Sequence, residues 1–162
     1  MHGIFHLRLS FSFDTLRISE AKCALSNQEG TEPRNGIFRL SRRELLFPSV
    51  DFHGFVFGEL RRNDQRTVVI QTRCTQNYKV QLTSQNSGSL VLEDGDESGT
   101  SRVGYSAFFD GQSVNFAANR SIQYSAADFY ENHKLMIQVG DISNKRAGLY
   151  KDVIVIRIMS AI

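Results

Sequence analysis

The chain has 162 residues, of which 41% are hydrophobic and 22% charged, so its length and composition are typical of one globular domain with its own core. The 19 basic and 17 acidic residues give a net charge of +2. This near balance argues against a partner such as duplex DNA, which requires a dense basic face. No apolar run approaches the roughly 18 residues that a membrane-spanning helix needs, so we expect no membrane insertion.

The first predicted element is a strand over Phe5–Phe13, in which large apolar side chains alternate with polar ones. Burial of the apolar row would contribute about 10 kcal/mol before entropy is subtracted. The strand could belong to the domain's own sheet, or it could be a donor strand that fills a groove in a neighbouring subunit. The apolar row consists of Phe5, Leu7, Leu9, Phe11 and Phe13.

The N-terminal segment also carries Arg8 and Arg17 among its apolar positions. It therefore lacks the continuous apolar stretch of a signal peptide, and we interpret the chain as a mature form.

Two cysteines, Cys23 and Cys74, are the only ones in the chain. In a reducing compartment they would be unrelated thiols, and in an oxidising one they would pair. A bridge between them would close a loop of about 51 residues and stabilise the fold by about 4 kcal/mol in the chain-entropy model. Neither cysteine has a second ligand at metal-binding spacing, so we expect no metal site here.

The rest of the chain has a period of two and almost no helical pattern, which indicates short strands. Asp110-Gly111 is a two-residue hairpin signal between two of them. Many short strands with turn residues between them favour an antiparallel sandwich or a small barrel. The clearest predicted strands are Thr67–Arg73, Tyr78–Leu82, Arg102–Phe109, His133–Val139 and Tyr150–Ile158.

No motif in the sequence argues for catalysis, and we expect no enzyme activity and no cofactor. The four histidines lack metal-ligand spacing and are expected at the surface or at a rim. The acidic run Glu93–Glu97 is expected to be a solvated turn rather than a calcium loop. Aromatic residues on alternating strands could stack on a sugar, but a core position is the more common explanation. The two sets are His2, His6, His53 and His133, and Tyr105, Tyr124, Phe129 and Tyr130.

Three features give the chain a family resemblance. Cys23 follows the alternating segment, Cys74-Thr75 stands just before Tyr78, and Gly148-x-Tyr150-x-Asp152 opens the last predicted strand. In this order the chain resembles the subunits of chaperone–usher pili of the archaic branch and the related spore coat protein U domain. The resemblance covers Cys23 to Ile158. It departs from the family where Val153 follows the Asp, a position at which family members tend to have Thr.

The resemblance implies an all-β, immunoglobulin-like antiparallel sandwich that is incomplete and is completed by a donor strand. We expect residues 1–18 to form the donor-strand segment and residues 19–162 the pilin-like domain. Cys23 and Cys74 would form a disulfide in the periplasm. A periplasmic chaperone would first cover the open apolar groove, which is an aggregation hazard, and the next subunit's strand would then replace it.

These expectations predict a structural subunit of a secreted pilus that assembles by donor-strand exchange, with a role in adhesion and biofilms. Its partners would be copies of the same or related subunits, the periplasmic chaperone and the outer-membrane usher. The subunit would pass through the periplasm to the cell-surface fibre. The alternative is a secreted adhesin or coat-type binding module that folds as a self-complemented β-sandwich.

Overall fold

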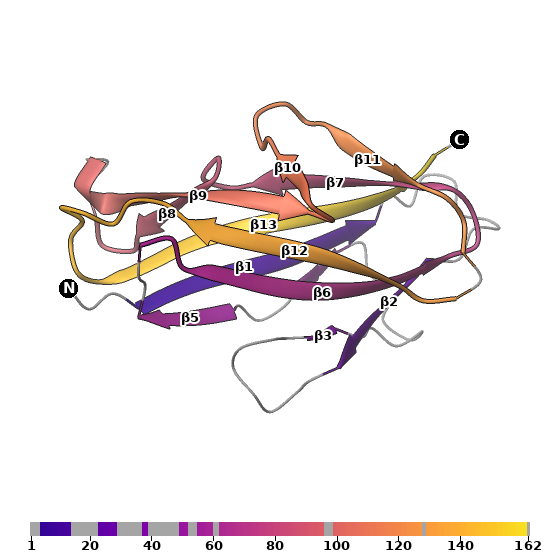
Figure 1. Cartoon of the computed structure of the whole chain (residues 1–162), viewed down its shortest axis with the longest axis horizontal. Helices are drawn as coiled ribbons and strands as arrows, with labels where there is room; N and C mark the ends of the chain where they lie inside the picture. The colour runs from indigo at the N-terminus through magenta and orange to yellow at the C-terminus, as the bar shows by residue number, and fades with distance from the viewer. Residues whose placement is uncertain are drawn as a thin grey trace.

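The computed structural model describes the backbone of residues 4–13, 23–28, 37–38, 49–51, 55–59, 62–95, 99–127 and 129–161, and most side chains from residue 62 onward. In this part of the chain the fold is all-β and largely antiparallel, with one short 3-10 turn, η1, at Gly99–Ser101 (Figure 1). No helix in these residues is long and apolar enough to cross a bilayer.

The described strands range from two residues in β3 to twelve in β13. The first five are β1 (Ile4–Phe13), β2 (Cys23–Gln28), β3 (Ile37–Phe38), β4 (Ser49–Asp51) and β5 (Phe55–Glu59). The next four are β6 (Gln65–Cys74), β7 (Tyr78–Ser84), β8 (Ser89–Leu92) and β9 (Arg102–Phe109). The last four are β10 (Gln112–Val114), β11 (Ser121–Tyr124), β12 (Glu131–Val139) and β13 (Leu149–Ser160).

Hydrogen-bonded strands follow one path, in the order β11-β7-β13-β8-β9-β12-β6-β2-β3. Four strands attach to the side of this path. β1 pairs with β13, β4 and β5, and β10 pairs with β9. In the described ladders only β1–β13 and β3–β6 are parallel. β13 is therefore a central strand, with β7 and β8 on one edge and β1 on the other.

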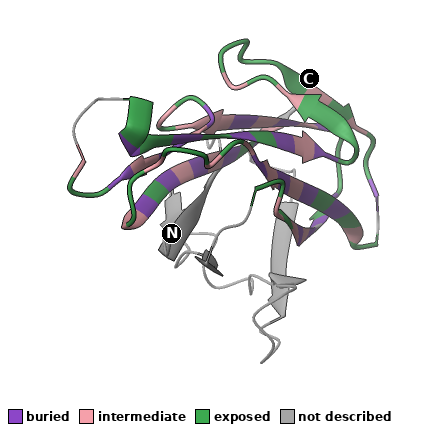
Figure 2. Ribbon diagram, turned by 60° about the vertical axis from the view of Figure 1, so that its left-hand side comes forward, coloured by how far each residue is buried: buried purple, intermediate pink, exposed green. Residues whose placement is uncertain are grey.

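The period of two seen in the sequence becomes an alternation of buried and solvent-facing positions along the long strands whose burial is described, β6, β7, β9, β12 and β13 (Figure 2). In β9, for example, Val103, Tyr105, Ala107 and Phe109 are all buried, while the residues between them are exposed or half-buried. All five predicted strands are confirmed, each extended by a few residues or matched at its ends. The alternation therefore identified these five strands correctly.

The predicted Asp110-Gly111 hairpin is also confirmed. Asp110 has a φ of 49° and Gly111 a φ of 79°, the pair of positive values that a type I′ turn requires. The turn joins β9 to β10, whose residues Gln112 and Val114 pair with Phe109 and Ala107.

Buried side chains from strands that are not neighbours in the ladder meet in one core. Tyr78 of β7 lies against His133 of β12, and Tyr105 of β9 lies against Asp152 of β13. Neither strand pair shares backbone hydrogen bonds, so these contacts join distant parts of the strand path across the core. The same core cluster includes Ile70, Leu82, Leu135 and Ile154, all at most 3% exposed.

Candidate functional site

The β1 strand lies inside the sheet. It pairs in parallel with β13 over its whole length of ten residues, as the two arrows that run in the same direction in Figure 1 show. Its other edge pairs in the antiparallel sense with β5 near Ile4–Leu7 and with β4 near Ser10–Ser12. The predicted strand over Phe5–Phe13 is therefore confirmed as a strand, and in the single chain its partner is the chain's own β13.

The β1–β13 register matches two alternating rows. The five apolar positions of β1 are level with residues of β13 that are at most 4% exposed. The polar positions between them, such as Ser10, are level with half-buried or exposed residues of β13 such as Val155. The matched pairs are Phe5 with Tyr150, Leu7 with Asp152, Leu9 with Ile154, Phe11 with Ile156 and Phe13 with Ile158.

Asp152 lies at the centre of a buried network. The residue is 2% exposed, and its carboxylate accepts four hydrogen bonds. Oδ2 accepts from the Tyr105 hydroxyl at 2.5 Å and from Ser84 Oγ at 2.7 Å, and Oδ1 accepts from the backbone N–H of Asn86 at 3.0 Å and of Val153 at 2.8 Å. These donors replace water around the buried carboxylate. The network ties β13 to β9 and to the β7–β8 turn.

The other two residues of the Gly148-x-Tyr150-x-Asp152 motif also have structural roles. The Tyr150 hydroxyl lies 2.8 Å from the carbonyl oxygen of Arg146 and 3.2 Å from that of Thr100, so it links the start of β13 to η1. Burial raises the pKa of this hydroxyl. At Gly148, which has a φ of 151°, a Cβ would lie 2.5 Å from Leu92 Cδ1. The motif therefore anchors the start of β13.

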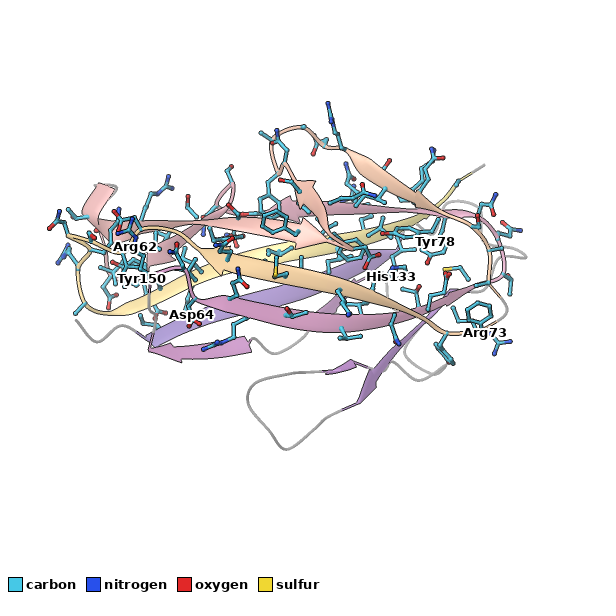
Figure 3. The ribbon with its side chains drawn as sticks, viewed as in Figure 1. Arg62, Asp64, Arg73, Tyr78, His133 and Tyr150 are labelled. Carbon is cyan, nitrogen blue, oxygen red and sulfur yellow. The ribbon has the colours of Figure 1, made fainter. Side chains whose placement is uncertain are left out.

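A second network lies around His133, near the opposite end of the molecule from Tyr150 (Figure 3). His133 Nδ1 lies 2.7 Å from Asp110 Oδ2, and His133 Nε2 lies 2.9 Å from Thr72 Oγ1 and 2.8 Å from the Tyr78 hydroxyl. Asp110 also accepts hydrogen bonds from the Tyr124 hydroxyl at 2.8 Å and from the backbone N–H of Lys134 at 2.7 Å. The network thus connects β6, β7, β11 and β12 to the β9–β10 turn.

Burial and neighbouring charges shift the pKa values of several groups in this network. Burial by itself would raise the pKa of Asp110, but the hydrogen bonds from His133, Lys134 and Tyr124 outweigh it and lower that pKa. Burial raises the pKa of Tyr78 and of Tyr124 well above the usual value for a phenol, and the nearby carboxylates of Glu131 and Asp110 raise both further. The tyrosine hydroxyls therefore stay protonated as hydrogen-bond donors.

The order Asp110, His133 and Thr72 has the hydrogen-bonding pattern of a nucleophilic triad. However, Thr72 is 2% exposed and His133 is 3% exposed, so a substrate has no access to the hydroxyl. Throughout the described part of the chain, no buried side-chain oxygen or nitrogen lacks a hydrogen-bond partner. The arrangement therefore serves packing and strand alignment, and we assign it no catalytic step.

His133 corrects one expectation from the sequence. It was expected at the surface or at a rim, and it is instead buried on the core face of β12. The alternation itself contained the signal, because His133 has the same parity as Leu135, Ile137 and Val139. His2 and His53 lie outside the described residues, and so does the side chain of His6. Within the described residues no group of three or more potential ligands could hold a metal ion.

The four aromatic residues considered for sugar stacking do not form one surface. Tyr105 is buried beside Asp152, and Tyr124 stacks on Tyr78 with ring centroids 5.2 Å apart. Phe129 and Tyr130 are exposed, at 69% and 45%. The core explanation is therefore confirmed for Tyr105 and is wrong for Phe129 and Tyr130, and the four residues do not form the stacking surface considered as the alternative.

The β2–β6 ladder places Cys23 directly opposite Cys74. Opposed residues in an antiparallel pair have Cα atoms about 4.5–5.5 Å apart, within the range of about 4.4–6.8 Å that a disulfide requires. Cys74 is fully buried. The register is thus compatible with the predicted disulfide. The predicted boundary between residues 18 and 19 lies outside the described residues, and so do Asp96 and Glu97 of the acidic run.

Comparison with known proteins found no family model and no curated protein that matches this chain.

Proposed function

We propose that the chain is a structural subunit of a secreted surface fibre and that it assembles by donor-strand exchange. The proposal rests on the pairing of β1 with β13. β1 covers ten of the twelve residues on one edge of β13, and its five large apolar residues are level with buried positions. Removal of β1 would leave a ten-residue unpaired edge on a central strand, which is a template for a strand from another subunit.

The proposed fold is an immunoglobulin-like sandwich whose last position is filled by β1 or by its equivalent from a neighbour. The contacts between Tyr78 and His133, and between Tyr105 and Asp152, support two layers that face each other. The chain crosses between the proposed layers at β8, which pairs with both β13 and β9.

The proposed export route follows from the cysteines. Direct opposition of Cys23 and Cys74 in the β2–β6 ladder supports a disulfide, which forms and persists in an oxidising compartment. We therefore propose passage through the periplasm, where a chaperone covers the groove, followed by incorporation into a cell-surface pilus at the outer-membrane usher. The chaperone and usher come from the family resemblance, and the exposed groove is the physical reason for needing them.

The test is strand complementation. A chain that lacks residues 1–14 should aggregate or remain a poorly stable monomer, and a synthetic peptide of residues 4–13 should restore a stable one-to-one complex. The same peptide with Leu9→Arg should fail, because it places a charge level with buried Ile154. A matched Ser10→Arg peptide should still bind. Light scattering and thermal unfolding would measure each complex, and a truncated chain that ignores the unmodified peptide would contradict the proposal.

A secreted adhesin or coat-type binding module is the second candidate. Pairing of β1 with the chain's own β13 favours it, because a self-complemented domain needs no neighbour. A full-length chain that stays monomeric at every concentration, and that never exchanges β1 for the peptide, would establish this alternative.

A further inference from the structure

We propose that β1 is an intramolecular cap, which keeps the free subunit closed by occupying the groove that a neighbour's strand needs for assembly. The inference rests on the proposed function, because a cap regulates assembly only if the groove accepts strands from other subunits. It goes further by naming the strand that holds the groove before assembly, which is the chain's own.

Pairing on both sides of β1 supports the cap. All ten residues of β1 have register partners in β13, and on its other edge β1 pairs with β5 and β4. A loosely associated arm would be expected at an outer edge with partial pairing. β1 instead covers the edge of β13 from the level of Leu149 to the level of Ile158, ten of its twelve residues.

The covalent connection between β1 and the rest of the chain favours the chain's own strand over a neighbour's strand in the competition for the groove beside β13. Residues 14–22 connect β1 to β2, so the strand is always close to its own groove. A strand joined to its own groove by so short a connection has an effective concentration on the order of 1 mM. If a neighbour's strand makes the same contacts, the chain's own strand is favoured roughly 100-fold at a protein concentration of about 10 µM. The free subunit therefore stays monomeric, and assembly requires a factor that holds β1 out of its groove.

A disulfide lock tests this proposal. Ser10 and Val155 are register partners, and Val155 is not in the buried core, so Ser10→Cys with Val155→Cys places two thiols within bonding range. The matched control is Ser12→Cys with Val153→Cys. These positions lie four register steps apart, roughly 13 Å, and cannot bond within one chain without a shift. Peptide mapping distinguishes the new bond from any bond between Cys23 and Cys74.

The cap predicts that the first pair bonds within single chains at about 10 µM and that the control pair does not. The oxidised chain should neither bind a labelled peptide of residues 4–13 nor form oligomers at millimolar concentration. Reduction of the new bond should restore both, with peptide uptake rising at least tenfold.

Two results would overturn the cap and would separate its failure from that of the proposed function. Disulfide bonds that form only between two chains would show that β1 lies in a neighbour's groove. That result would contradict the cap and would still support donor-strand assembly. Bonds within one chain, combined with no peptide uptake and no oligomers after reduction, would show that β1 is a permanent strand. That second result would contradict both the cap and donor-strand assembly.

Discussion

The Tyr105 hydroxyl donates a hydrogen bond to Asp152 Oδ2 across the core, at a distance of 2.5 Å. Tyr105 lies on β9 and Asp152 on β13, strands that share no ladder. The contact therefore joins two parts of the sheet that backbone pairing does not connect directly. Burial, followed by the charge of Asp152, raises the pKa of Tyr105, so the donor proton is retained throughout the neutral range.

Replacement of Tyr105 by Phe should lower the free energy of unfolding by about 1.5–3 kcal/mol, the value of a hydrogen bond to a charged group. The ring remains and only the hydroxyl is lost, so the cost reports on the Asp152 network. Urea denaturation would measure it. The control is Tyr130→Phe at an exposed position, which should change stability by less than about 0.5 kcal/mol. Equal effects of the two changes would mean that the network does not stabilise the fold.

Gly148→Ala should destabilise the fold by about 1–3 kcal/mol, because the new Cβ would meet Leu92 Cδ1 and the φ of 151° is unfavourable for alanine. A matched control is Gly104→Ala in β9, where a Cβ meets nothing within 4 Å. If the Leu92 contact dominates, adding Leu92→Ala should make the Gly148→Ala change less costly than it is in the wild-type background. Thermal unfolding of the four variants would test this, and strict additivity would assign the cost to the backbone instead.

The Asp110 carboxylate should make the fold sensitive to acid. Its pKa is lowered from the ordinary value of 3.8, so it contributes stability that is fully present above pH 3.8. Below that pH the unfolded chain takes up the proton first, and the contribution is lost as the pH falls through the lowered pKa of the folded state. Denaturation at several pH values should give Asp110→Asn a shallower acid slope than the wild type. Gln112→Ala, in the same hairpin, should keep the wild-type slope, and parallel curves for Asp110→Asn would contradict the prediction.

A disulfide between Cys23 and Cys74 should stabilise the chain by about 4 kcal/mol. Reduction should lower the midpoint of denaturation of the wild type, and the double variant Cys23→Ser with Cys74→Ser should unfold at the lower midpoint with or without reductant. Thiol titration of the oxidised, unfolded chain should find no reactive thiol. Two reactive thiols in that experiment would exclude the bond.

The sequence predicted the long strands because each alternates over at least five residues, a signal that depends only on the pleat of the strand. It did not yield β8 and β11, whose four residues are too few for a period to stand out. The buried networks were missed for a different reason. Thr72, His133 and Asp152 all have core-facing parity, but sequence cannot show which polar groups meet across the core. The pairing of β1 with β13 could not be predicted either, because it joins residues 4–13 to residues 149–158, which are far apart in the sequence.

The Leu9→Arg change in the intact chain tests the function most directly. Leu9 is near the middle of β1 and level with Ile154, which is fully buried, so Leu9→Arg places a charge beside a buried apolar position. We expect Leu9→Arg to abolish fibre assembly in cells and to destabilise the free chain in the same direction as removal of residues 1–14, because the changed strand no longer docks on β13. Ser10→Arg adds the same charge at the next position, level with half-buried Val155, and should still assemble. Normal fibres from the Leu9→Arg chain, seen by electron microscopy, would rule out β1 as the assembling strand.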